Sequence, residues 1–314
     1  MAINRRGFFG STLAAGAAAA LPATPARAEK TAQRYQNGIS PWPLALNAST
    51  VRPAPLKDKV AAAAGAGWDA IELWIDDLEK HEQGGGNLQN LGKQIRDLGL
   101  FVPNIIGLWG AMPATAEAFA ASLPATRERM RRSAAVGSKF VAAIPLPDRA
   151  NFDTNWGTHC LRELMRIGRQ DYNLKVAVEF VGFLKGIHSF GQAAGMALNT
   201  DDPAACVVMD TFHLFRGGSG FNGIKLIQGQ LIADFHWNDV PGNIPREKLR
   251  DQDRVYPGDG VLPLTQVLKD LKVIGYRRTL SLELFNREYW KQDPKRVATD
   301  GLRKMRECLA KAGV

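Results

Sequence analysis

Short runs of apolar residues recur along the chain, and each is separated from the next by a longer segment with helical spacing. The runs are apolar on successive positions and are bounded by Gly, Asn, Asp or Pro, a pattern typical of parallel strands covered on both faces. They occupy residues 43–47, 70–74, 101–106, 140–144, 176–180, 206–209, 232–235 and 280–284. We therefore predict eight buried parallel strands.

The segments between the runs carry the period of an amphipathic helix. Leu88, Leu91 and Ile95 follow that period before Gly99, and a similar pattern stops at Gly275. Eight strand–helix alternations predict one α/β domain, a closed (β/α)8 TIM barrel. A doubly wound open sheet is the alternative, but no glycine-rich GxGxxG turn follows the first strand. The longest predicted loops follow the fifth and seventh strands, at residues 182–202 and 238–260.

The first 28 residues have the features of an export signal. They contain the Arg5-Arg6 pair, a weakly apolar stretch at residues 13–21 that is too short to span a bilayer, and Ala26-Arg27-Ala28 at the expected cleavage position. The segment resembles a twin-arginine signal peptide. We therefore predict a signal peptide at residues 1–28, a barrel domain at residues 29–314, and a periplasmic or otherwise exported protein.

Composition and charge exclude several classes of protein. Hydrophobic residues make up 45% and charged residues 23% of the 314 residues, as in an ordinary globular protein. Three cysteines without CxxC spacing indicate neither a disulfide framework nor a cysteine zinc site. The net charge is +9, but three of the positive charges lie in residues 1–28. The densest basic patch reads as a solvated helix face and not as a nucleic-acid site; it consists of Arg127, Arg129, Arg131 and Arg132, beside Glu128.

Four consecutive predicted strands end in polar residues: Glu179, Asp210, His236 and Glu283. In a closed barrel these strand ends meet at one rim, where carboxylates on neighbouring strands repel one another unless a positive group lies between them. Three carboxylates and an imidazole form an oxygen-rich set that suits Mn or Mg, and Zn, Fe or Co can also occupy it. We predict a divalent-metal site, with Mn favoured because folding around the metal before export avoids competition from Zn.

Five short motifs together carry a family resemblance. The chain resembles the xylose isomerase-like TIM barrels, or sugar phosphate isomerases/epimerases, which include ketose 3-epimerases, hydroxypyruvate isomerase, inosose dehydratase and, more distantly, endonuclease IV. The resemblance covers about residues 39–312. Its motifs are Val178-Glu179-Phe180, Asp210-Thr211-Phe212-His213, His236-Trp237-Asn238-Asp239, Tyr256-Pro257-Gly258-Asp259-Gly260 and Ser281-Leu282-Glu283-Leu284.

The resemblance implies roles for individual residues. The four strand-end residues match the family's metal ligands, and His213 matches a histidine that contacts substrate near the metal. Glu72 lies where the family often has an acid that faces the pocket, and Trp109 lies where an aromatic side chain can form a pocket wall. Each has a structural alternative: a helix cap for His213, a buried ion pair for Glu72 and loop packing for Trp109.

Two positions depart from the ketose 3-epimerase pattern. An acid expected six residues after the first ligand is replaced by Lys185, and an arginine expected six residues after the histidine ligand is replaced by Gly242. We assign Lys185 and Arg246, the nearest basic substitute, to substrate binding, with a solvated loop position as the alternative for Lys185. These departures leave the predicted metal site unchanged and weaken the assignment to epimerases.

The predicted function is metal-dependent isomerisation or epimerisation of a keto-sugar or keto-polyol through a metal-stabilised enediolate, with Glu179 and Glu283 transferring protons. A lyase or dehydratase that uses the same intermediate is the alternative. An endonuclease IV-like nuclease and a non-catalytic sugar-binding protein are less well supported, because a nuclease of that type needs more histidines along the rim. We expect a small-molecule sugar as partner, no nucleic acid and no stable membrane insertion; the sequence leaves a homo-oligomer open.

Overall fold

Eight parallel strands form a closed barrel in the computed structural model, which describes residues 34–314. The strands are β1 (Leu44–Asn47), β2 (Ala70–Trp74), β3 (Asn104–Leu108), β4 (Phe140–Ala143), β5 (Lys175–Glu179), β6 (Val207–Asp210), β7 (Ile232–Trp237) and β8 (Leu280–Leu282). Each strand pairs with the next in sequence, and β8 pairs with β1. The predicted (β/α)8 barrel is confirmed. The predicted signal peptide lies outside the described residues.

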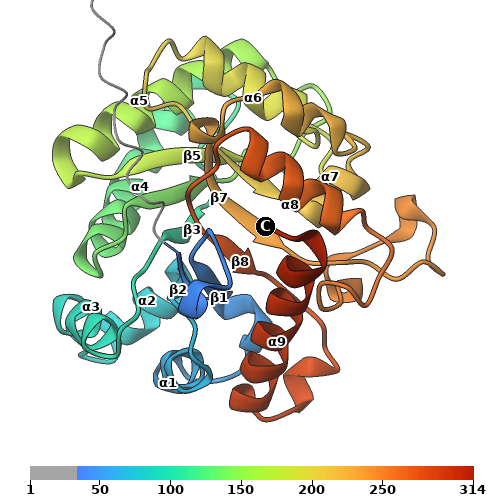
Figure 1. Cartoon of the computed structure of the whole chain (residues 1–314). Coiled ribbons are helices and arrows are strands. Elements are labelled where there is room, and N and C mark those ends of the chain that lie inside the picture. Colours follow the sequence, from blue (N-terminus) through green and yellow to red (C-terminus); the bar gives the residue numbers. More distant parts are fainter. Residues whose placement is uncertain (1–33) are drawn as a thin grey trace, which may run out of the picture. The chain divides into compact units, whose positions relative to one another are not determined.

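Helices surround the barrel (Figure 1). They are α1 (Leu56–Ala66), α2 (Ile75–Gln83), α3 (Leu88–Asp97), α4 (Ala116–Ala135), α5 (Thr154–Tyr172), α6 (Phe190–Asn199), α7 (Thr211–Arg216), α8 (Leu264–Val273) and α9 (Pro294–Ala312). The predicted helix before Gly99 is α3, whose first turn is capped by the Asn87 side chain. Among residues 34–314, no helix combines the length and apolar character needed to cross a membrane.

The hydrophobic core has two parts. The larger part contains side chains of both the strands and the surrounding helices. A smaller cluster consists of Ile106, Ala142, Ile144, Ala177, Cys206, Val208 and Ala233, on or next to β3 to β7. On β1, β2 and β8, by contrast, Asn47, Glu72 and Ser281 are completely buried polar residues that contact one another. The barrel therefore contains a buried polar region beside its apolar one.

Two predicted boundaries differ from the structure. The third strand is Asn104–Leu108 and not residues 101–106, because Phe101 forms only an isolated bridge with Ala70. The predicted loop at residues 182–202 contains α6, whose start is a capping box: the Ser189 hydroxyl accepts the Gln192 amide hydrogen, and the Gln192 side chain accepts the Ser189 amide hydrogen. This Ser-x-x-Gln pattern is a helix-start signal that was present in the sequence.

Candidate metal centre

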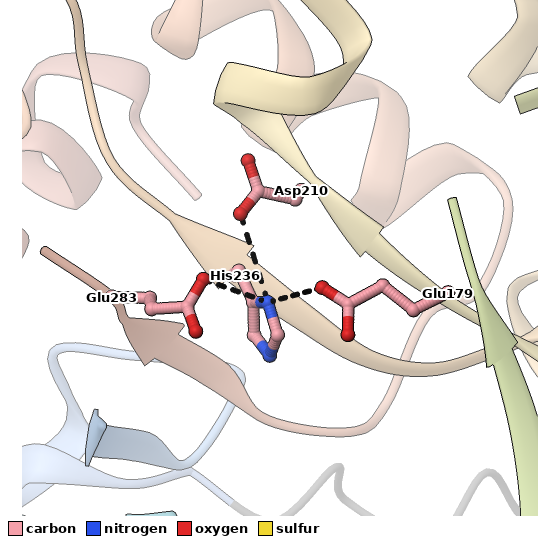
Figure 2. Close-up of side chains that lie close together, drawn as sticks. All are labelled: Glu179, Asp210, His236 and Glu283. Carbon is pink, nitrogen blue, oxygen red and sulfur yellow. Dashed lines mark ion pairs between the residues drawn. The ribbon is translucent and has the colours of Figure 1, made fainter. Parts of the chain in front are cut away.

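The four predicted metal ligands converge at the carboxyl ends of the strands (Figure 2). Their candidate ligand atoms all lie within 4.8 Å of one another. His236 Nδ1 is 3.3 Å from Glu179 Oε1, 3.6 Å from Asp210 Oδ2 and 3.1 Å from Glu283 Oε2. All four side chains are buried, with at most 4% of each residue exposed. The cluster therefore forms one enclosed site.

Strand register brings these residues together. Asp210 pairs with His236 across β6 and β7, and His236 pairs with Ser281 across β7 and β8. Successive side chains of a strand point to opposite faces, so Glu283, two residues after Ser281, points to the same side of the barrel as Ser281. The short-range pattern of each strand thus places its polar residue at the rim, and the pairing of the strands makes the residues neighbours.

The residues fit a divalent cation. His236 Nδ1 is buried and has no hydrogen-bond partner in residues 34–314, although three carboxylates surround it. Burial by itself lowers the pKa of His236, but the neighbouring Glu283, Glu72 and Glu179 carboxylates raise it well above its ordinary value. The carboxylates of the cluster therefore stabilise a positive charge between them, and its oxygen and nitrogen atoms are suitable ligands for Mn, Mg or Zn.

Arg254 is a member of the site that the sequence prediction missed. Its Nη1 donates to Asp210 Oδ2 at 2.7 Å and to Glu283 Oε2 at 2.8 Å, which are the same oxygens that face His236. Its Nη2 donates to Asp251 at 2.6 Å and lies 3.2 Å from Nε2 of His213. The residue is only 1% exposed. A buried guanidinium thus supplies positive charge to two of the candidate ligands.

The fold of the segment after β7 delivers Arg254 to the rim. Asp239 accepts the amide hydrogens of Gly258 and Gly260 at 3.0 and 3.1 Å, and it also forms an isolated bridge with Val255. A side chain at Gly260 would approach Val240 O to 2.2 Å, so only glycine fits there. The Tyr-Pro-Gly-Asp-Gly motif therefore folds this segment back toward the barrel, next to Arg254.

His213 lies at the same rim, at the start of α7. Its backbone amide donates to Asp210 Oδ1 at 2.9 Å, which caps the helix, and its Nδ1 accepts the Gly182 amide hydrogen at 3.1 Å. Burial lowers the pKa of His213 to about 4, so the ring is neutral at pH 7. The cap is therefore Asp210 and not His213, whose neutral ring lies at the rim between Gly182 and Arg254.

Glu72 lies within the polar interior and not in the pocket. Its Oε1 is 3.1 Å from His236 Nε2 and accepts from Asn104 at 2.8 Å, while its Oε2 accepts from Asn47 at 2.7 Å and Ser281 at 2.5 Å. The prediction of a pocket-facing acid therefore differs from the structure, because four partners hold the carboxylate against the far side of the imidazole. This contact orients the ring so that Nδ1 points at the other ligands.

A second acid, Asp234, lies close to Glu72 and His236 and forms with them another group of potential ligands. Its Oδ2 is buried without a hydrogen-bond partner in the described part of the chain. Burial and the nearby Glu72 carboxylate raise the pKa of Asp234 well above its ordinary value. A carboxyl group whose protonated form is favoured is a weaker cation ligand, so this group suits a cation less well than the rim cluster.

We expect Glu72→Gln to weaken metal binding about 10- to 100-fold, the usual cost of losing a group that orients a metal-ligating histidine. The amide retains the shape of the side chain but removes the charge that faces His236 Nε2. Metal affinity is measured by competition with a chelator. Glu117→Gln, an exposed glutamate on α4, serves as the control and should leave affinity unchanged. Equal affinities for both variants would show that Glu72 does not position His236.

A cavity of about 190 Å³ opens above the cluster, and we call it the inner cavity. Its polar lining consists of Glu179, His213, Asp251, Arg254 and Glu283, and Trp109 contributes to its apolar wall. The apolar wall also includes Trp74, whose ring centroid lies 5.6 Å from that of Trp109, and Phe285.

Lys185 and Arg246 do not reach the inner cavity. Both side chains are exposed, and neither lines it. The Lys185 backbone amide donates to Asp148, and Arg246 lies in a short 3-10 helix, Arg246–Lys248. This arrangement gives no support to their expected contacts with substrate. The basic side chain at the rim is Arg254, which belongs to the same segment after β7 as Arg246.

Comparison with known proteins places the fold in a family. The family model for xylose isomerase-like TIM barrels matches residues 60–308. The chain belongs to this family. Among the solved structures of similar fold, the IolI protein with a bound zinc atom has a TM-score of 0.79 at 24% identity, and the match covers 86% of this chain and 98% of that one. L-ribulose 3-epimerase has a TM-score of 0.68 at 17% identity, and the match covers 86% of this chain and 95% of that one.

Two curated members of the xylose isomerase-like family show its range. An inosose isomerase from Bacillus licheniformis is 35% identical over 161 residues, which cover 50% of this chain and 57% of that protein. A 3-dehydroshikimate dehydratase from Pseudomonas putida is 22% identical over 257 residues, which cover 80% of this chain and 39% of that protein. The chain thus matches little more than half the length of the inosose isomerase. The names of these relatives include both isomerisation and dehydration.

Proposed function

We propose that this protein is a divalent-metal-dependent isomerase or epimerase of a keto-sugar or keto-polyol. The observation that carries the proposal is the placement of two carboxylates. Glu179 and Glu283 lie on opposite sides of His236 Nδ1 (Figure 2), and both line the inner cavity. Two carboxylates that line one small cavity from different strands are the kind of pair that a proton transfer between the two faces of a substrate carbon requires.

Glu179, Asp210, His236 and Glu283 would hold the metal. When bound, a divalent cation supplies Lewis-acid stabilisation of the negative charge that develops on a substrate carbonyl oxygen. We propose Mn as the resident metal, and the same donor set accepts Mg, Co, Zn or Fe. The zinc atom of the IolI structure is a property of that protein.

The chain's own residues move the proton. One of the two glutamates removes the proton from the carbon beside the carbonyl, and the electron pair of the broken C–H bond shifts onto the carbonyl oxygen. In epimerisation the other glutamate delivers a proton to the opposite face of the same carbon, and the carbonyl re-forms. In isomerisation the proton is delivered instead to the former carbonyl carbon, and the proton of the neighbouring hydroxyl passes to the former carbonyl oxygen, so that the carbonyl moves to the neighbouring carbon. Arg254 and His213 line the same cavity and help to position the substrate: the guanidinium attracts its negatively charged oxygen, and the His213 ring, whose Nδ1 accepts from Gly182, presents Nε2–H as a donor.

Glu179 and Glu283 differ in their surroundings, which suits different roles in the proposed proton transfer. Glu283 accepts a hydrogen bond from Arg254 at 2.8 Å. Burial raises the pKa of Glu179 to about 7, opposed by His236 and assisted by the Glu283 and Asp210 charges. Glu283 thus faces a guanidinium, whereas Glu179 has no such partner in residues 34–314.

A dehydratase is the second candidate. The same proton abstraction can expel a hydroxyl group from the adjacent carbon, and the dehydratase relative aligns with 80% of this chain. A nuclease with a cluster of metals is not supported, because each candidate metal group in residues 34–314 contains a single histidine, His236. The twin-arginine leader lies outside those residues, and we propose export on its sequence alone.

We expect metal-loaded protein in D2O to introduce deuterium at the carbon beside the carbonyl of its substrate. The protein is loaded in turn with Mn, Mg, Co or Zn and incubated with an inosose and with a panel of ketohexoses; mass spectrometry then reports deuterium, epimers and loss of water. Chelator-treated protein is the control. Deuterium with an epimer or isomer supports the first candidate, and deuterium with water loss supports the dehydratase. No exchange with any compound, despite bound metal, would contradict proton abstraction.

A further inference from the structure

A larger cavity of about 780 Å³ adjoins the inner cavity, and we call it the outer cavity. The two cavities share Phe183, Asp251 and Phe285 as lining residues. The inner cavity, at about 190 Å³, is smaller than the roughly 300–1,000 Å³ of typical small-molecule sites, whereas the outer cavity lies within that range. A compact reacting group at the metal cluster can therefore belong to a ligand that extends into the outer cavity.

Unpaired basic side chains line the outer cavity. Arg250 and Arg287 are exposed, and within residues 34–314 their guanidinium groups form neither an ion pair nor a hydrogen bond. Arg216 also lines this cavity, and only its Nε is used, in a 3.1 Å hydrogen bond to Leu249 O. Lys248 adds a fourth positive charge to the wall. Several N–H donors are thus available to one ligand.

Acidic groups do not neutralise this wall. Glu247 and Asp251 are the acids that line the outer cavity. Asp251 also pairs with the buried Arg254, at 2.6 Å. Four basic side chains thus face two carboxylates along the wall. The outer cavity therefore carries net positive charge and attracts anions.

The densest basic patch of the sequence, on α4, differs from the outer cavity in how its arginines are paired. Each arginine of that patch on α4 forms an ion pair with a surface acid; the partners are Asp171, Glu79, Glu82 and Glu128. The most concentrated positive charge in the sequence is thus paired with acids. The unpaired guanidinium groups, those of Arg250 and Arg287, line the outer cavity instead, beside the candidate active site.

We propose that the outer cavity binds an anionic group, a carboxylate or a phosphate monoester, on a substrate whose carbonyl lies in the inner cavity. Arg216, Arg250 and Arg287 provide the contacts, because guanidinium groups form paired, charge-assisted hydrogen bonds with both anions. The inference rests on the proposed function for the inner cavity and adds the substrate's charge. Phe183, Phe285 and Trp290 supply apolar surface for the part of the substrate between its two ends.

The test compares three keto-sugars that differ in one group: D-fructose, D-fructuronate with a carboxylate at the same end, and D-fructose 6-phosphate. Binding to the metal-loaded full chain is measured by calorimetry at low and high salt. The anionic probes should bind about tenfold or more tightly than D-fructose, and added salt should reduce that preference. If only D-fructuronate binds more tightly than D-fructose, the cavity is assigned to carboxylates. If only D-fructose 6-phosphate binds more tightly than D-fructose, the cavity is assigned to phosphate monoesters.

The double variant Arg250→Gln/Arg287→Gln should remove most of the preference of the anionic probes over D-fructose. Arg277→Gln is the matched control, because Arg277 is exposed and precedes β8, whereas Arg287 follows it at the other end of the barrel. Equal binding of all three probes, no binding of either anion, or a preference that survives in the double variant would overturn the proposal. Deuterium uptake in the same samples tests the proposed function separately, since anion preference without exchange contradicts only that function.

Discussion

Arg254→Met is expected to lower the free energy of unfolding of the metal-free protein by about 3–5 kcal/mol. The guanidinium is buried and donates to Asp210 and Glu283 at 2.7 and 2.8 Å, so methionine leaves two buried carboxylates without that positive charge. Urea unfolding in the presence of a chelator measures the loss. The control is Arg132→Met, which removes a partly exposed arginine paired with Glu79 and Glu82 and should cost about 1 kcal/mol or less.

Added metal should restore much of the stability lost in Arg254→Met. A ligand that binds only the native state stabilises it by about 2.7 kcal/mol at one hundred times its dissociation constant. Because Arg254 Nη1 contacts the same oxygens that face His236, the gain on adding metal should be larger in the variant than in the parent chain. A loss below about 1 kcal/mol without metal, or an equal gain in both proteins, would mean that Arg254 does not balance the carboxylates of the site.

Glu283→Gln should lower turnover by about 10² to 10⁴, the range typical of losing a general base, while metal remains bound more weakly. The amide keeps an oxygen near His236 but removes the charge and the basicity. Asp210→Asn should instead lose the metal first, because Asp210 does not line the inner cavity and has no proposed proton-transfer role. Asparagine also keeps an acceptor for the His213 amide at the start of α7, which limits damage to that helix.

Metal content measured beside turnover separates these two outcomes. Each variant is assayed at increasing metal concentration, so that a loss of activity caused by weak binding is recovered at saturation. Asp210→Asn should recover in part under those conditions, whereas Glu283→Gln should not. Full activity of Glu283→Gln at full metal occupancy would make Glu283 a bystander and would require a mechanism with one carboxylate base.

The strands and the ligand cluster could be predicted because both follow from local pattern. A parallel strand covered on both faces is apolar on successive residues, so each run marked its strand to within a few residues, with β3 displaced the most. The barrel then brings all carboxyl strand ends to one rim. Glu179, Asp210, His236 and Glu283 therefore had to be neighbours once the fold was assigned, and the structure places them within 4.8 Å.

The partners of these ligands could not be predicted in the same way. Glu72 was placed at the end of the second strand, but its direction depended on Asn47, Asn104 and Ser281, which come from three other strands. Spacing along the chain favoured Arg246 as the basic group of the long segment after β7. The structure exposes Arg246 and buries Arg254, because Asp239 folds that segment back onto the barrel.

By itself, the sequence determined the barrel, the order of its strands and the four side chains at its rim, because burial and strand direction are set residue by residue. Only the tertiary structure decided which charges meet: Arg254 with Asp210 and Glu283, Glu72 with His236, and the free arginines around the outer cavity. Such contacts join segments far apart in the chain. Their energy depends on distance and burial in the folded barrel, and the spacing of residues along the chain specifies neither.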